Sequence, residues 1–152
     1  MQNFNSLEEI LDFAIRDEIR ASNLYADLAK KSRNKEIKKV FEQFSQEELG
    51  HKRKLERMKY GDIAVLTDDK VQDLKIGDYL VEVDANRDNL SYQDALIIAM
   101  KEEKAAFKLY SELAERIDDD TARDVLLLLA KEEARHKLRF EIEYDDYILS
   151  EN

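Results

Sequence analysis

Residues 47–51 read Glu-Glu-Leu-Gly-His, and residues 132–136 read Glu-Glu-Ala-Arg-His. The two stretches lie 85 positions apart and contain the only two histidines of the chain. Further residues coincide at the same shift: Ser6 with Ser91, Leu11 with Leu96, Glu18 with Glu103, and Tyr25 with Tyr110. Any two amphipathic helices match along their apolar positions, but that does not explain two matched histidines. The repeat therefore predicts two helical hairpins related by duplication.

The composition predicts an all-α protein. The chain has 152 residues, of which 43% are hydrophobic and 39% charged, with three glycines and no proline. Sandwiches and barrels need many turns built with Gly and Pro, so all-β folds are excluded. The length fits one domain over residues 1–152. We expect a four-helix bundle with one hairpin at 6–60, a long crossover at 61–90 and a second hairpin at 91–149.

The charge and the cysteine content exclude several classes of function. A net charge of −10 argues against nucleic acid or an anionic membrane as a partner. The lack of cysteine excludes disulfides, thiol catalysis and thiolate-bound metal clusters. The first residues lack the basic and apolar regions of a signal peptide. No purely apolar run is longer than that of residues 125–130, which is too short to span a bilayer. We expect a cytoplasmic protein.

Each of the four predicted apolar helix faces is interrupted near its middle by polar side chains. Residues at i and i+3 lie on the same face of a helix, one turn apart. The interrupting residues are Glu18 in the first helix, Glu48 and His51 in the second, Glu103 in the third, and Glu133 and His136 in the fourth. The four glutamates are each fifteen residues from the nearer predicted turn, at about residue 33 or 118. The sequence thus predicts six polar side chains in one layer of the core.

Four buried carboxylates repel one another, and each buried ion loses several kcal/mol of solvation. They can share protons, as in a metal-free polar core, or bind cations. Two divalent ions carry the charge that balances four carboxylates, and two neutral imidazoles complete the donor set. One Glu from each of two helices plus Glu-x-x-His from each of the other two is the donor set of dimetal carboxylate bundles. We expect a dimetal site.

At these residues the chain resembles the rubrerythrin-like branch of the ferritin-like di-iron carboxylate superfamily. The resemblance rests on residues 14–25, 47–51, 99–110 and 132–136. It implies a ferritin-like bundle with an up-down-down-up order of helices and a centre of two iron ions, with manganese as the alternative. The implied metal ligands are Glu18, Glu48, His51, Glu103, Glu133 and His136, of which Glu48 and Glu133 are the bridging carboxylates.

Four neighbouring residues need a separate interpretation. Similar proteins place tyrosines at the positions of Tyr25 and Tyr110, where they donate hydrogen bonds to the ligand carboxylates; the alternative is aromatic packing in the core. Glu47 and Glu132 directly precede two of the ligands and point about 100° away from them on a helix. We interpret them as charges on the solvent face.

Two departures from the resemblance limit what it implies about activity. Rubrerythrins proper carry a rubredoxin module with four cysteines, which this chain lacks. They also have an additional carboxylate one turn from the ligand of the third helix, where this chain has Met100 and Ala106. Any electrons must therefore come from another protein, and a complete peroxidase cycle does not follow.

We expect an oxidoreductase that reduces peroxide or dioxygen with an external electron-donor protein. Glu18, Glu48, Glu103 and Glu133 are the candidate catalytic residues, since carboxylates change their coordination when iron is oxidised. Alternatives are ferritin-like iron oxidation and storage, manganese catalase-like activity, and a non-catalytic metal-binding or interaction bundle. We also expect a homodimer. Residues 84–88 begin like an EF-hand loop, but Asn89 and Ala95 replace its glycine and its last glutamate, so we interpret them as a polar turn.

Overall fold

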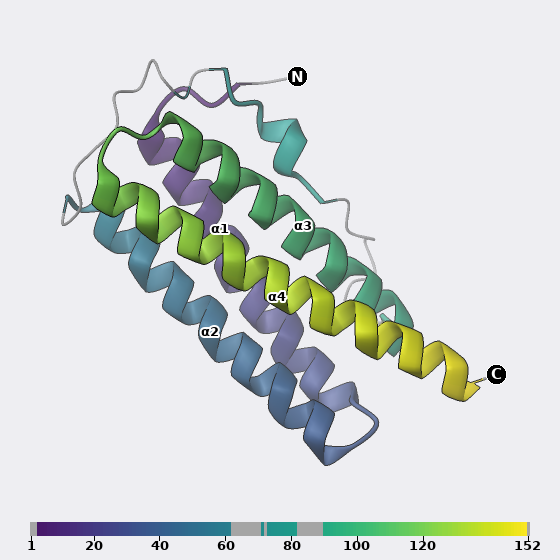
Figure 1. Ribbon diagram of the computed structural model, residues 1–152. Coiled ribbons are helices and arrows are strands. Elements are labelled where there is room, and N and C mark those ends of the chain that lie inside the picture. Colours follow the sequence, from purple (N-terminus) through teal and green to yellow (C-terminus); the bar gives the residue numbers. More distant parts are fainter. Residues whose placement is uncertain (1–2, 62–70, 72, 82–89, 152) are drawn as a thin grey trace.

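Four long helices form the protein. The computed structural model describes residues 3–61, 71, 73–81 and 90–151. The helices are α1 (Leu7–Lys31), α2 (Lys35–Lys59), α3 (Tyr92–Arg116) and α4 (Asp120–Glu151), with a short 3-10 helix, η2 (Ile76–Tyr79), before α3 (Figure 1). No β-strand occurs among these described residues, which form one isolated bridge between Asn3 and Lys75. The prediction of an all-α four-helix bundle is confirmed.

Polar side chains fix where each helix begins. The side chains of Ser6, Asn34 and Ser91 accept hydrogen bonds from the backbone N–H groups three residues later, which have no partner within the helix. The Asp119 carboxylate does the same for α4, at 2.8 Å from the nitrogen of Ala122. After α2, Gly61 takes a φ of 88°, a conformation that glycine adopts without strain.

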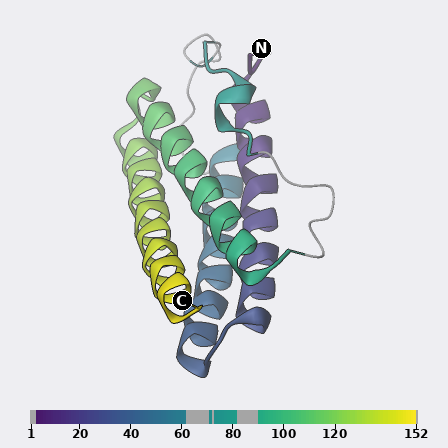
Figure 2. The same cartoon turned by 90° about the vertical axis from the view of Figure 1, so that its right-hand side faces the viewer.

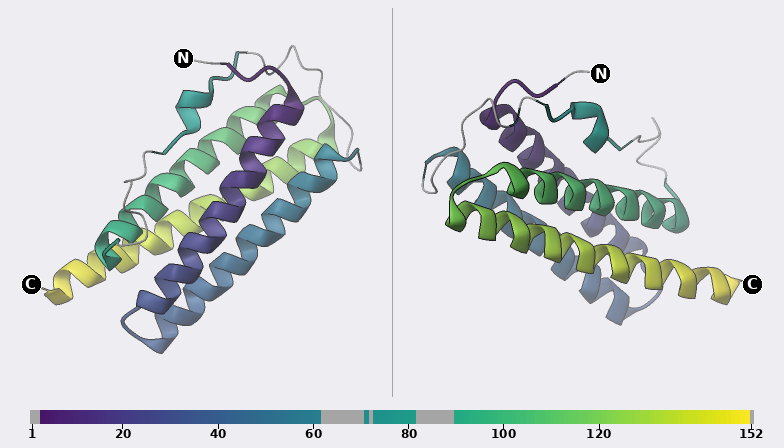
Figure 3. Two further views of the ribbon diagram at one scale, coloured as in Figure 1. Left: turned by 180° about the vertical axis from the view of Figure 1, so that it is seen from behind. Right: turned by 45° about the horizontal axis from the view of Figure 1, so that its top comes forward.

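The helices are arranged as two hairpins. α1 packs mainly against α2, and α3 mainly against α4. α1 and α4 run in one direction and α2 and α3 in the other, so the connection from α2 to α3 returns along the bundle (Figure 1). Figure 2 shows the described part of this connection beside the beginning of α1. α4 ends at Glu151 and continues past the beginning of α3 (Figure 3).

The described part of the crossover is held against α1 and α3. Val71, Leu74 and Tyr79 are buried. The N–H of Phe4 donates to the carbonyl of Leu74 at 2.9 Å, and the Tyr79 hydroxyl donates to Glu112 at 2.7 Å. The predicted polar turn at 84–88 lies outside the described residues. None of the described helices combines the length and the apolar character needed to cross a membrane.

The apolar core has two parts, which we name after two residues that correspond at the shift of 85. The Leu55 cluster consists mainly of aliphatic side chains and includes Leu11, Leu55, Leu113, Leu126 and Leu129. The Phe140 cluster is rich in aromatic rings and includes Tyr25, Phe41, Phe44, Tyr92 and Phe140. The polar layer lies between the two clusters, so apolar packing at both ends fixes its position along the helices.

Candidate metal centre

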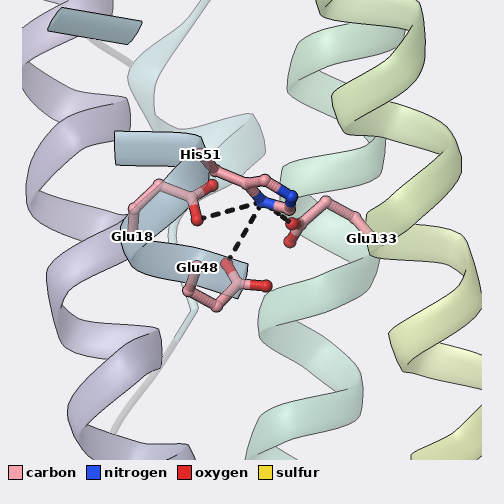
Figure 4. Close-up of side chains that lie close together, drawn as sticks. All are labelled: Glu18, Glu48, His51 and Glu133. Carbon is pink, nitrogen blue, oxygen red and sulfur yellow. Dashed lines mark ion pairs between the residues drawn. The ribbon is translucent and has the colours of Figure 1, made fainter. Parts of the chain in front are cut away.

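The six residues predicted for the polar layer meet in the interior of the bundle. They are Glu18 on α1, Glu48 and His51 on α2, Glu103 on α3, and Glu133 and His136 on α4, and all are buried. Figure 4 shows Glu18, Glu48 and Glu133 pointing toward the ring of His51 from three helices. Each of these residues lies on the face of its helix that also carries the core leucines and phenylalanines, so folding of the apolar face places the polar groups inside.

The donor atoms form two overlapping groups. In one, Glu18, Glu48, His51 and Glu133 each offer an atom within 4.8 Å of the others; in the second, Glu48, Glu103, Glu133 and His136 do so. Glu48 and Glu133 belong to both groups. A carboxylate has two oxygens and can therefore contact two ions, so the geometry suits two metal ions with these two carboxylates between them.

Both histidines point the same nitrogen at the cluster. His51 Nδ1 lies 2.6 Å from Glu133 Oε1 and 3.4 Å from Glu18 Oε2. His136 Nδ1 lies 2.8 Å from Glu48 Oε1 and 3.8 Å from Glu103 Oε1. In each case Nδ1 is the nitrogen available to a metal, and Nε2 points away from the cluster.

Glu47 and Glu132 contact the outer nitrogens of the two histidines. His136 Nε2 lies 3.0 Å from Glu47 Oε1, and His51 Nε2 contacts Glu132 Oε2. Both glutamates are half-buried, and each contact joins one hairpin to the other. Our interpretation of them as solvent-face charges was therefore incomplete, because a direction about 100° from the core can still reach a neighbouring helix. A carboxylate at Nε2 fixes the proton there and leaves Nδ1 free for a metal.

The tyrosines contact the cluster from opposite hairpins. The Tyr25 hydroxyl on α1 donates to Glu103 Oε1 on α3, and the Tyr110 hydroxyl on α3 donates to Glu18 Oε1 on α1. Both rings are also fully buried among apolar side chains, so hydrogen bonding and packing occur together. Burial and the nearby carboxylate charges raise the pKa of both hydroxyls well above the usual value, which keeps them protonated as donors.

Burial and mutual repulsion disturb the ionisation of the cluster. Both effects hold the pKa values of Glu48 and Glu133 well above the ordinary value for a glutamate. Burial alone would lower the pKa of His51, but the carboxylates of Glu133 and Glu18 outweigh it and raise this pKa to about 11. Burial opposes ionisation of Glu18 too, yet the adjacent side chains of Glu48 and His51 leave its pKa below the usual value. Without cations, the cluster therefore keeps protons that it would otherwise release.

Several atoms of the cluster lack a hydrogen-bond partner within the described structure. They are one oxygen each of Glu18, Glu48, Glu103 and Glu133, and Nδ1 of His51. Buried polar atoms without a protein partner are rare in native proteins, and such atoms commonly bind a water or an ion. Carboxylate oxygens with one imidazole nitrogen per group suit iron or manganese. These residues therefore fit a pair of such ions.

A small cavity leads to the cluster between α1 and α3. It measures about 20 Å³, and the ligand carboxylates Glu18 and Glu103 form part of its wall. Asp17, Arg20 and Glu102 also line it. Arg20 lies 2.5 Å from Asp17 and 3.7 Å from Glu102, and burial raises the pKa of Asp17 to about 6. A cavity of this size holds about one water-sized molecule.

Sequence reasoning missed two buried carboxylates. Glu102 directly precedes a predicted ligand, and its correspondence with Asp17 at the shift of 85 was the available signal. Glu143 lies one turn beyond Phe140 on the inner face of α4 and is completely buried. Arg33 donates to both of its oxygens, at 3.1 and 3.2 Å, and the Tyr92 hydroxyl donates at 2.6 Å. Glu143 therefore joins α4 to the α1–α2 turn and does not belong to the metal cluster.

Two solved structures are similar to this chain in overall fold. The chain is similar to a Thermotoga maritima protein described as ferritin-like and diiron-carboxylate, with 24% identity, a TM-score of 0.78, and coverage of 97% of this chain and 99% of that one. It is also similar to a hypothetical protein from Pyrococcus furiosus, with 26% identity, a TM-score of 0.69, and coverage of 92% and 89%. No curated protein matches the chain.

The sequence model of the family described as Rubrerythrin matches residues 9–144, which include all six residues of the cluster. The structural likeness confirms the ferritin-like fold. The family and the buried carboxylate–histidine cluster together support a dimetal protein. Because the family model matches most of its length, the chain belongs to the rubrerythrin family.

Proposed function

We propose that this protein holds two iron ions and reduces peroxide with electrons from an external donor protein in the cytoplasm. The observation that carries the proposal is the pair of buried donor groups that share Glu48 and Glu133. The ligands we propose are Glu18, Glu48, His51, Glu103, Glu133 and His136. When bound, two iron ions supply the two electrons that convert peroxide and two protons into two water molecules.

The residues of the chain determine how such a centre is held. Glu47 and Glu132 orient the histidine rings, so that Nδ1 of each ring stays directed at the cluster. The four ligand glutamates each have one oxygen without a hydrogen-bond partner, which would leave that oxygen free to bind a metal ion. Tyr25 and Tyr110 each hold one oxygen of a non-shared glutamate in place.

The cavity favours a small oxidant. Its volume of about 20 Å³ accepts a molecule of one or two heavy atoms and excludes an organic substrate. Peroxide and dioxygen are both small enough for this cavity, and we propose peroxide as the first candidate for the oxidant. The 152 residues contain no cysteine that could carry electrons to the cluster, which supports an external donor as the reductant.

Metal analysis tests the proposal. Protein produced with iron and manganese should contain about two ions of iron per chain, and the variant Glu48→Ala/His51→Ala should contain almost none. Glu42→Ala is the matched control, because Glu42 is exposed on the same helix. The iron-loaded protein should consume peroxide when a reductant is supplied, and the double variant should not. Absence of metal from the unmutated protein overturns the proposal.

Three further interpretations have distinct outcomes in the same preparation. Iron storage requires a closed shell of many subunits, so a large particle that accumulates iron well beyond two ions per chain would favour it. Oxygen evolution from peroxide without any donor, by manganese-loaded protein, would favour a catalase-like reaction. Bound metal without turnover of peroxide or dioxygen would favour a non-catalytic metal-binding bundle.

A further inference from the structure

The outward face of α4 carries a stripe of exposed apolar residues. Leu127, Leu138, Ile142 and Leu149 are 48%, 58%, 45% and 74% exposed. At spacings of three and four they share one face with three more exposed residues. We name this face the α4 stripe and define it as Leu127, Lys131, Ala134, Leu138, Ile142, Asp145 and Leu149.

The α4 stripe has no role in the core or the metal cluster. The inner face of α4, with Leu126, Leu129, Glu133, His136 and Phe140, is buried and lies on the opposite side of the helix. A helix that is apolar on two faces has more apolar surface than one bundle needs. The centre of the α4 stripe, Ala134, Leu138 and Ile142, is a contiguous exposed apolar stretch. Single-chain proteins rarely leave such a stretch uncovered when it belongs to a larger patch, so the α4 stripe indicates a surface that another molecule covers.

The order of residues in the α4 stripe is self-complementary. Consider two copies of α4 that pack antiparallel about a two-fold axis at Leu138. Each residue of one copy then faces the residue of the second copy that lies the same number of positions from Leu138 in the opposite direction along the chain. Leu127 then faces Leu149 of the second copy, Lys131 faces Asp145, and Ala134 faces Ile142. Leu138 faces its own counterpart on the axis. Every apolar residue therefore meets an apolar residue, and each cation meets an anion.

The charges also select the direction of packing. In a parallel pair related by a two-fold axis, Lys131 would face Lys131 of the second copy and Asp145 would face Asp145, which repels. Within the described part of the chain, neither Lys131 nor Asp145 forms an ion pair, so both are available to a second copy. The stripe spans 23 residues, from Leu127 to Leu149, or about 33 Å of helix, which gives a contact along most of α4.

A hollow beside the stripe adds to the same surface. It lies between α2 and α4, and Val40, Phe44, Leu138 and Ile142 form its apolar wall. Side chains of a second copy that overhang the stripe can fill this hollow. The apolar surface thus extends from α4 onto α2, as in the apolar centre of a homodimer interface.

We propose that two copies of this chain associate through the α4 stripe, antiparallel about a two-fold axis at Leu138. The pairing goes beyond the proposed function, and no residue of the stripe contacts the metal cluster. The protein is therefore a dimer with or without metal. Both metal clusters lie on the far sides of the two α4 helices from the contact.

Sedimentation of the full chain tests the proposal at concentrations from about 1 to 100 µM. We expect the mass of two chains. Leu138→Lys places two lysines against each other on the axis and should give the mass of one chain. Because Leu138 is exposed, the variant should keep the helical circular dichroism and the unfolding temperature of a folded bundle.

A charge exchange tests the antiparallel register. Lys131→Asp should raise the dissociation constant of the dimer by at least about tenfold, since the substituted carboxylate would face Asp145 of the second copy twice per dimer. Asp145→Lys should have the same effect, and the double variant should restore the dimer. Lys104→Asp, an equal change of charge at an exposed site on α3, is the control and should leave the dissociation constant unchanged.

Three results would overturn the proposal. One is a monomer at every concentration, which leaves the stripe to a different protein. Another is a dimer that persists in Leu138→Lys, which places the contact on a different face. The third is a double variant that stays as weak as the single variants, which contradicts the antiparallel pairing of Lys131 with Asp145.

Discussion

The two hairpins share their polar residues and differ in the packing around them. Glu18, His51 and Tyr25 have counterparts of the same type 85 positions later, and Tyr25 and His51 each contact a glutamate of the other hairpin. Leu55, in contrast, corresponds to Phe140, and Leu129 corresponds to Phe44. The residue types of the polar layer are the same in both hairpins because their donor atoms must lie close together. The apolar residues differ because different apolar side chains can fill the same core volume.

The difference reaches the histidines themselves. The ring of Phe44 stacks on His136 with centroids 4.0 Å apart, and Phe140 lies 5.5 Å from Phe44. The residue that corresponds to Phe44 at the shift of 85 is Leu129, which has no ring to stack on a histidine. The end of the bundle with the Phe140 cluster also has the ion pair of the buried Glu143 with Arg33, which is exposed. Two half-sites with equal ligands therefore lie in unequal surroundings.

The largest expected effect comes from removing a shared carboxylate. Glu48→Gln takes an oxygen from both donor groups, so we expect it to reduce the metal content from about two ions per chain to almost none. Glu18→Gln and Glu103→Gln each affect one group and should leave about one ion. Elemental analysis of the three purified variants measures this. Equal losses of metal in all three variants would mean that the two donor groups do not bind their metal ions independently.

The position of the polar layer could be predicted because it depends on helical periodicity alone. Glu48 and His51 lie one turn apart on an apolar face, and the spacing from the turn places them level with Glu18. The contact of Glu132 with His51 could not be predicted in this way. It depends on the distance between α2 and α4, which no single helix determines. The same holds for Glu143, whose partner Arg33 lies in the turn of the other hairpin.

The beginnings of three helices could also be predicted, because Ser6, Asn34 and Ser91 form their N-caps within three residues. The crossover could not. Its described part is fixed by long-range contacts, such as the hydrogen bond of Tyr79 to Glu112 and the pair of Asp73 with Arg116. Periodicity carries no information about such contacts.

The second prediction tests whether the two apolar clusters contribute differently. Phe140→Ala should lower the free energy of unfolding by about 4 kcal/mol and Leu55→Ala by about 3 kcal/mol. The ring of Phe140 contacts the rings of Tyr25 and Phe41, so its removal leaves the larger cavity. Denaturant titration of metal-free protein gives both values. Phe107→Ala, at an exposed position, is the control and should change little.

The third prediction concerns pH and metal removal. The pKa values of Glu48, Glu133 and His51 are raised in the fold, so the folded chain holds more protons than the unfolded chain above about pH 5. The metal-free protein should therefore lose stability as the pH rises from about 5 to about 9. The lowered pKa of Glu18 acts only below this range.

Bound metal should reverse the trend, since its ligands must be deprotonated. Thermal unfolding at several pH values, with and without iron, separates the two cases. A metal-free protein whose unfolding temperature stays constant or rises over this range would contradict the electrostatic account of the cluster.

The fourth prediction compares the two tyrosines. Tyr25→Phe and Tyr110→Phe each remove a hydrogen bond to a non-shared carboxylate and keep the packing of the ring. We expect each to weaken metal binding by about tenfold, measured by competition with a chelator. Equal effects would show that the hydrogen bond matters more than the surroundings. A much larger effect of Tyr25→Phe would show that the Phe140 cluster also supports its carboxylate.

The smallest expected effect belongs to Arg20, whose counterpart on α3 is Ala105. Arg20→Ala makes the first hairpin resemble the second at the cavity. The free energy of unfolding should fall by less than about 1 kcal/mol, because the ion pairs of Arg20 are partly exposed. Metal loading should become faster, because Asp17 and Glu102 lose the cation between them and attract metal ions more strongly.

Arg16→Ala is the matched control for Arg20→Ala, since it removes the same charge from an exposed position of α1 that does not line the cavity. Loading rates measured by stopped flow at low and high salt separate the two variants. If metal loads faster only in Arg20→Ala, and only at low salt, the metal enters through the cavity between α1 and α3. Equal rates would place that path elsewhere, and the unequal pair of Arg20 and Ala105 would then be a difference in surface charge alone.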